Sequence, residues 1–201
     1  MIFTFYSFKG GVAQVLAERG LKVLAVDFDL EAPGLERYFF DGDEARHRRT
    51  QRGLIDLVAA YREALTNEAA FQRAAFRDLA QFTQPVRDPV NAHGGKLDLV
   101  TAGRREPDEA LRDYALMVRT FDWQDFFKNW KGDRFFDWLQ RQWNAPETGY
   151  DVVLIDSRTG VTEMGGVCAY QRPTWRCCCA RRTTRTWKAH ATWCATSSAA
   201  G

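Results

Sequence analysis

The segment Ile2-Phe3-Thr4-Phe5-Tyr6-Ser7, followed after Phe8 by Lys9-Gly10-Gly11-Val12, decides how the first part of this 201-residue chain can fold. An apolar run that leads into a glycine-rich turn and a helix is typical of a phosphate-binding loop, in which backbone N–H groups surround phosphate oxygens. Such a loop continues with a basic residue and a hydroxyl residue. Here Val12 is followed by AQVLAERG, which places neither at the required position. The pattern therefore begins a phosphate site and does not complete it.

A second apolar run, Lys22–Asp27, predicts another strand, and residues 12–19 predict a short helix that ends at Gly20. Together these elements form a βαβ unit. A six-residue strand spans roughly 20 Å, whereas eight helical residues rise only about 12 Å. The connection between the two parallel strands is therefore short by about two helical turns.

The rest of the chain alternates predicted helices and strands. Residues 41–52 are polar and predict a surface loop. We expect helices over 53–65, 69–79, 108–121 and 123–143, and strands over 97–101 and 151–156. The alternation predicts an α/β fold with a mostly parallel sheet flanked by helices. The helix over 123–143 carries an aromatic stripe, which usually packs in a core and otherwise binds a partner.

Three predicted strands end in polar groups: Lys9-Gly10-Gly11 follows the first, Asp27 and Asp29 the second, and Asp156 the last. Ligands of open parallel sheets bind outside the carboxyl ends of the strands. A lysine with free N–H groups suits phosphate, and carboxylates suit Mg²⁺ or the orientation of a water. Each feature has a simpler interpretation, as a common turn, a loop cap or a solvated side chain. Their joint order predicts an ancestral nucleotide site.

Residues 5–12, 26–36 and 152–163 resemble the deviant Walker A P-loop ATPases, the ParA/MinD/CobQ-like group, and within it the bacterial KGGVGR-variant branch. The resemblance spans residues 1–171. It implies a P-loop NTPase-like fold with a helical insertion at about 41–150, and an ATPase that binds ATP and Mg²⁺. It also implies switching by nucleotide-gated formation of a homodimer.

By this resemblance, Lys9 corresponds to the signature lysine that contacts phosphates, and Gly10, Gly11 and Val12 to the first part of the phosphate loop. The family continues with Gly, then Lys or Arg, then Ser or Thr, and then about two further turns of helix. These residues are absent after Val12. They supply the cation for the β- and γ-phosphates and the hydroxyl for Mg²⁺. We therefore expect an impaired ATP site and an incomplete version of the fold.

The carboxylates also acquire roles from the resemblance. Asp29 corresponds to the residue that orients the hydrolytic water, which makes Asp29 and Lys9 the candidate catalytic residues. Asp27 and Asp156 are the candidate Mg²⁺ residues, and Asp156 corresponds to the Walker B carboxylate. Arg158 and Gly160 fall in the second switch loop.

Residues 172–201 differ from the rest in composition, since they hold six of the 28 basic residues, none of the 26 acidic residues and four of the five cysteines. We interpret this stretch as a frameshifted, disordered tail. Shifted by one base, the codons of Cys177-Cys178-Cys179 encode leucine at their junctions, where the family has a buried strand. The alternative is a metal cluster, but three adjacent cysteines do not converge on one tetrahedral ion with the usual spacing. Non-specific nucleic-acid binding by the basic tail is a further alternative.

The composition, 45% hydrophobic and 27% charged, is that of a soluble globular protein. No apolar run approaches the roughly 20 residues of a membrane span, and no signal peptide precedes the first strand, so we expect a cytoplasmic protein. Without the tail the chain has a net charge of −4, which gives no specific nucleic-acid signal. A second hypothesis is a nucleotide-independent interaction module that binds an unknown protein partner through the aromatic helix over 123–143.

Overall fold

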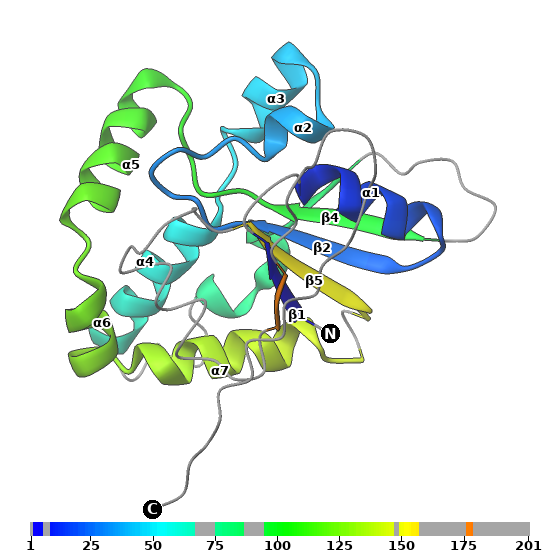
Figure 1. The fold of residues 1–201 in the computed structure, drawn as a ribbon. Helices are drawn as coiled ribbons and strands as arrows, with labels where there is room; N and C mark the ends of the chain where they lie inside the picture. Colours follow the sequence, from blue (N-terminus) through cyan, green and yellow to red (C-terminus); the bar gives the residue numbers. More distant parts are fainter. Residues whose placement is uncertain are drawn as a thin grey trace, which may run out of the picture.

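The computed structural model describes residues 2–5, 9–66, 75–86, 95–146, 149–156 and 176–178. Within these ranges the chain forms one six-stranded sheet with the order β3-β4-β2-β5-β1-β6 (Figure 1). All neighbouring strands are parallel except β3, which is antiparallel to β4. The strands are β1 (Ile2–Phe5), β2 (Lys22–Asp27), β3 (Gln84–Pro85), β4 (Lys96–Val100), β5 (Val152–Asp156) and β6 (Arg176–Cys178).

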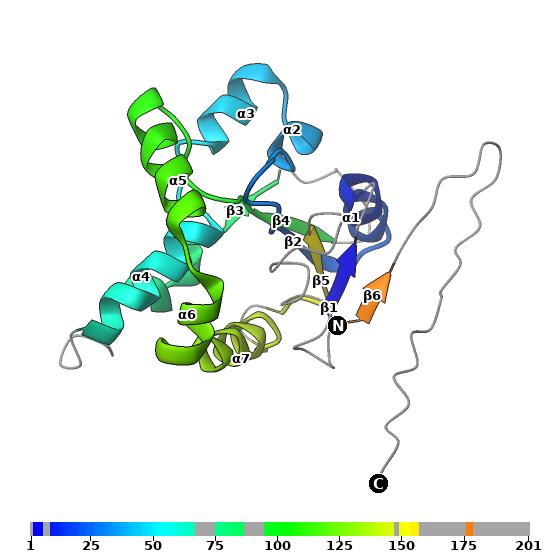
Figure 2. The same cartoon turned by 60° about the vertical axis from the view of Figure 1, so that its left-hand side comes forward.

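Helices cover both faces of the sheet (Figures 1 and 2). They are α1 (Lys9–Glu18), α2 (Glu36–Phe39), α3 (Gly42–Arg48), α4 (Leu54–Thr66), α5 (Asp108–Thr120), α6 (Trp123–Asn129) and α7 (Gly132–Trp143), with 3-10 helices η2 (Ala75–Arg77) and η3 (Leu79–Phe82). Successive strand residues face opposite sides. Val23 and Ala25 therefore pack with α1, whereas Leu24 and Val26 pack with α4, α6 and α7. The predicted α/β class and the mostly parallel, helix-flanked sheet are confirmed.

The segment 41–150, expected as a helical insertion, also contributes two strands to the sheet. β4 pairs along its whole length with β2, and β3 pairs with the outer side of β4. The expected loop over 41–52 is wrong in part, because Gly42–Arg48 forms α3. Acidic residues in its first turn and basic residues in its last turn complement the helix dipole, and Glu44 pairs with Arg48 one turn later at 3.0 Å.

The single helix predicted over 123–143 is wrong, since the chain breaks it into α6 and α7. Lys131 has a left-handed backbone, with φ of 56°, and Gly132 follows it at the start of α7. A Cβ on Gly132 would lie 2.5 Å from the Phe126 ring, so the two helices meet too closely there for any larger residue. Because of this break, the aromatic side chains of α6 and α7 pack together in one core.

Two other predictions fall partly outside the residues that the structure describes. Of the helix predicted over 69–79, the described part, from Ala75, forms the short 3-10 helices η2 and η3 instead. Of the tail predicted to be disordered, Arg176–Cys178 forms β6, which lies parallel to β1 at the edge of the sheet (Figure 2). The other residues of 172–201 lie outside the described residues, as do Arg158 and Gly160. Across the described part of the chain, no helix combines the length and apolar character needed to cross a membrane.

Candidate functional site

The carboxyl ends of β1, β5 and β2 lie at one level of the sheet. Phe5 pairs with Asp156, and Asp156 pairs with Asp27 in the next strand. Adjacent strands lie about 4.8 Å apart, so the two aspartates are neighbours. Both lie on the same face of the sheet as Ala25 and Leu154, which pack beneath α1, and α1 begins at Lys9 on the same edge, shortly after β1 ends. The structure thus brings together the strand ends that carry the predicted site residues.

Asp27 is fully buried at the end of β2, and backbone N–H groups surround its carboxylate. Gly34 and Leu35 donate to Oδ2 at 3.0 and 3.1 Å, and Asp29 donates to Oδ1 at 3.2 Å. Burial raises the pKa of Asp27 to about 6, although the hydrogen bonds from Leu35 and Gly34 oppose this shift. Asp27 therefore closes the loop from β2 to α2, and it does so with both of its oxygens.

Asp29 and Asp156 are more accessible than Asp27, and both are half-buried. The Asp29 Oδ1 atom accepts a hydrogen bond from the Ala32 N–H at 3.2 Å, which turns the loop back toward α2. The Asp156 carbonyl accepts from the Phe28 N–H at 2.7 Å, so the chain from β2 stays joined to β5 one residue past the strand. These contacts hold Asp27, Asp29 and Asp156 around one short stretch of backbone.

A buried ion pair fixes this loop from the other side. Arg105, which follows β4, donates to the Glu36 Oε2 atom at 3.0 Å and to the Pro33 carbonyl at 3.4 Å. Glu36 is completely buried, and Arg49 approaches its second oxygen at 3.6 Å. Breaking such a buried pair on one side is costly, because it leaves an uncompensated charge. The Arg105–Glu36 pair therefore sets the position of the loop that carries Asp27 and Asp29.

Sequence reasoning missed Arg105, Glu36 and also Tyr114. The Tyr114 hydroxyl donates to the Leu30 carbonyl at 2.6 Å and thereby ties α5 to the same loop. The available signal was weak. An arginine just after a predicted strand and a glutamate just after Pro33-Gly34 are both common on surfaces, and nothing local indicates that they meet.

The structure corrects the prediction for the glycine-rich turn. Lys9, Gly10, Gly11 and Val12 form the first turn of α1 and not a loop ahead of a helix that begins at residue 12. A Cβ on Gly11 would also lie 3.0 Å from the Tyr38 hydroxyl, so α2 lies against this turn. The N–H groups here are those of a helix end, which leaves its first four without intrahelical partners.

The predicted Mg²⁺ site of Asp27 and Asp156 stays a prediction, because Mg²⁺ usually keeps several waters and needs only one or two protein carboxylates. This ion requires six oxygens in nearly regular octahedral geometry. The Asp27 oxygens already accept three backbone N–H groups, and the hydroxyl described nearest to the start of α1 is that of Tyr38. Throughout the described ranges, no three His, Cys, Asp or Glu side chains converge in a way that suits a metal ion.

The aromatic side chains of the second hypothesis are mostly core. Trp123, Phe126, Phe135 and Phe136 are buried together with sheet residues such as Val153. Most of the stripe therefore packs against the sheet, whereas Phe127, Trp130 and Trp138 are only partly buried.

Comparison of the chain with models of known protein families, and with curated proteins, gave no match to either.

Proposed function

We propose that this chain is a degenerate relative of the ParA/MinD-like P-loop ATPases. Its nucleotide site keeps the carboxylates of β2 and β5 but no longer binds phosphate. The observation that carries the proposal is the register of the strand ends. Asp27 and Asp156 are paired across β2 and β5, and α1 begins at the same edge. This is the crevice outside the carboxyl ends of parallel strands where α/β folds bind nucleotides.

The same geometry supports a loss of activity. A phosphate loop holds oxygens with the backbone that precedes its helix, but here Gly10 and Gly11 are already helical and Tyr38 lies over Gly11. What remains is a helix N-terminus, which attracts anions weakly. Asp29 can still orient a water, and the backbone of α1 starts with Lys9 at this edge. Neither residue replaces the missing Lys or Arg and Ser or Thr of the family pattern.

Calorimetric titration of the whole chain with Mg²⁺ and ATP tests the proposal directly. Each lost charge-assisted hydrogen bond costs about 1.5–3 kcal/mol, so the loss of two weakens binding by roughly 100-fold or more. We expect no binding at micromolar ATP and no release of phosphate. Micromolar affinity for ATP in the unmodified chain would contradict the proposed loss.

An insertion between Val12 and Ala13 tests the ancestry separately from the loss. One variant receives Gly-Arg-Ser and about seven helix-forming residues, which add two turns. The matched control receives Gly-Ala-Ala and the same helical residues. We expect the Gly-Arg-Ser variant to bind Mg·ATP at least about tenfold more tightly than the control, since one charge-assisted contact is worth about that factor. It should also dimerise with ATP, as the family does.

Equal affinities in two folded insertion variants would refute the assignment of this edge as a nucleotide site. Circular dichroism establishes that both are folded. The interaction-module hypothesis has less support, because most of the aromatic side chains on which it depends are buried in the core, although Phe127, Trp130 and Trp138 are only partly buried.

A further inference from the structure

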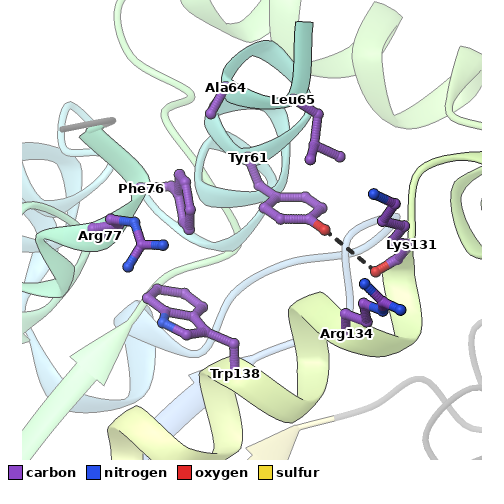
Figure 3. A pocket seen from close by; sticks show the side chains of 8 residues that line it. All are labelled: Tyr61, Ala64, Leu65, Phe76, Arg77, Lys131, Arg134 and Trp138. Atoms are coloured by element: carbon purple, nitrogen blue, oxygen red, sulfur yellow. Dashed lines mark hydrogen bonds between the residues drawn. The ribbon is translucent and has the colours of Figure 1, made fainter. Parts of the chain in front are cut away.

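A second site-like feature lies on the face of the sheet opposite α1. A cavity of about 490 Å³ opens between α4, η2 and α7 (Figure 3). This volume is within the range of about 300–1,000 Å³ that small-molecule sites occupy. The cavity is separate from Asp27 and Asp156, which lie on the α1 side of the sheet.

Aromatic rings form the inner part of this cavity. Phe76 makes edge-to-face contacts with Tyr61, at 5.4 Å between ring centroids, and with Trp138, at 5.0 Å. The Tyr61 hydroxyl donates to the Lys131 carbonyl at 3.3 Å, which fixes the ring relative to the start of α7 (Figure 3). Trp138 is only half-buried. The rings therefore form a rigid apolar wall of which part is open to the cavity.

Cationic side chains surround the aromatic wall. Arg77 lies over the Phe76 ring, at 5.4 Å from its centroid, while Lys131 and Arg134 come from the opposite side of the cavity (Figure 3). Lys131 and Arg134 are exposed. None of the described side chains that line the cavity is acidic. Asp133 precedes Arg134 in α7, and burial together with the negative charge of Asp133 raises the pKa of the Tyr61 hydroxyl. The cavity thus combines a flat apolar wall with a positive rim.

We propose that this cavity binds a small aromatic anion. The ring of the ligand packs against the half-buried Trp138, which the buried Phe76 ring supports, and its phosphate, sulfonate or carboxylate group is held by Lys131 and Arg134. Aromatic side chains favour offset or edge contacts with another ring. A guanidinium group with its planar donors suits bidentate contact with an oxyanion. The inference does not depend on the proposed nucleotide site.

Titration with 1-naphthyl phosphate tests the proposal, with 1-naphthol and inorganic phosphate as probes for each half of the ligand. Binding to the whole chain is measured by calorimetry and by saturation-transfer NMR. We expect 1-naphthyl phosphate to bind at least about tenfold more tightly than either partial probe, because the wall and the rim act together. Equal binding of 1-naphthol would overturn the proposal, since it would leave the cations without a role.

Two substitutions on the same helix give a matched comparison. Arg134→Gln removes a cation from the rim, and Arg141→Gln removes an exposed cation of α7 that does not line the cavity. We expect Arg134→Gln to weaken binding by about fivefold or more and Arg141→Gln to leave it unchanged. Lys131→Gln serves as a second rim variant if Arg134→Gln does not fold. Unchanged affinity in a folded rim variant would refute the site. Asp156→Asn should leave the affinity for 1-naphthyl phosphate unchanged, because the cavity is separate from the strand ends.

Discussion

The two faces of the sheet are built from different side chains. On the α1 face the helix contributes Ala13 and Ala17 as its fully buried residues, and the strands add aliphatic side chains such as Leu97. On the opposite face, called the aromatic face below, the Phe126 ring contacts the rings of six other side chains: Tyr61, Phe121, Trp123, Phe127, Phe135 and Phe136. Buried area scales with side-chain size. We therefore expect the aromatic face to contribute more to the stability of the fold than the α1 face.

Phe126→Ala should break this comparison most strongly. The side chain is 1% exposed at the centre of the aromatic cluster, so its removal leaves a cavity that rigid rings cannot close. We expect a loss of about 3–5 kcal/mol in the free energy of unfolding, measured by urea denaturation. Leu16→Ala in α1 removes a half-buried side chain and should cost clearly less.

The exposed Val15 on α1 provides the control, because Val15→Ala changes a side chain of the same helix without altering a core. A loss for Leu16→Ala as large as that for Phe126→Ala would show that the α1 face contributes equally, and the contrast between the faces would be lost.

How far the sequence predicts these regions depends on the range of the interactions. The buried strands β2 and β5 follow from continuous apolar runs, and β4 from Leu97, Leu99 and Val100. That Asp27 and Asp156 lie at the same edge of the sheet follows from their places at strand ends, although their direct pairing was not predicted. The break at Lys131 was not predictable, because it arises from contact between Gly132 and Phe126 in a packed core.

The ion pair of Arg105 with Glu36 could not be predicted from the sequence either, since these residues lie 69 positions apart. Local periodicity carries no information on such a pair. The helical state of Lys9–Val12 was missed for another reason. The motif predicts a loop, but these residues form the first turn of α1. The motif therefore did not predict the conformation of this segment.

The pH dependence of the unfolding free energy tests the role of Asp27 on the α1 face. The pKa of Asp27 in the folded state is about 6, above its usual value of 3.8, so the folded protein holds this proton more tightly. The stabilisation is complete below about pH 4 and is lost as the pH rises through 6. At 1.36 kcal/mol for each pKa unit, the change is at most about 3 kcal/mol.

Asp27→Asn removes this titration and keeps an oxygen for the Gly34 and Leu35 N–H groups. We expect the stability of the wild type relative to Asp27→Asn to fall between pH 4 and 7, measured by urea denaturation at each pH. Leu116→Ala, an exposed substitution on α5 that removes no carboxylate, should run parallel to the wild type. A constant difference between wild type and Asp27→Asn would show that burial of Asp27 does not raise its pKa.

The smallest expected effect concerns a hydrogen bond that joins the two regions. Tyr114 packs in the aromatic-face core, and its hydroxyl donates to the Leu30 carbonyl in the loop that follows β2. Tyr114→Phe keeps the ring and removes this hydrogen bond, so we expect a loss of about 1–2 kcal/mol in unfolding free energy. Amide hydrogen exchange adds a local measurement. Because the bond holds the loop, the N–H groups of Gly34 and Leu35 should exchange faster in Tyr114→Phe, while amides of α7 should not change. Equal acceleration at both places would mean that the substitution loosens the whole core, and that Tyr114 does not specifically couple the aromatic face to the loop around Asp27.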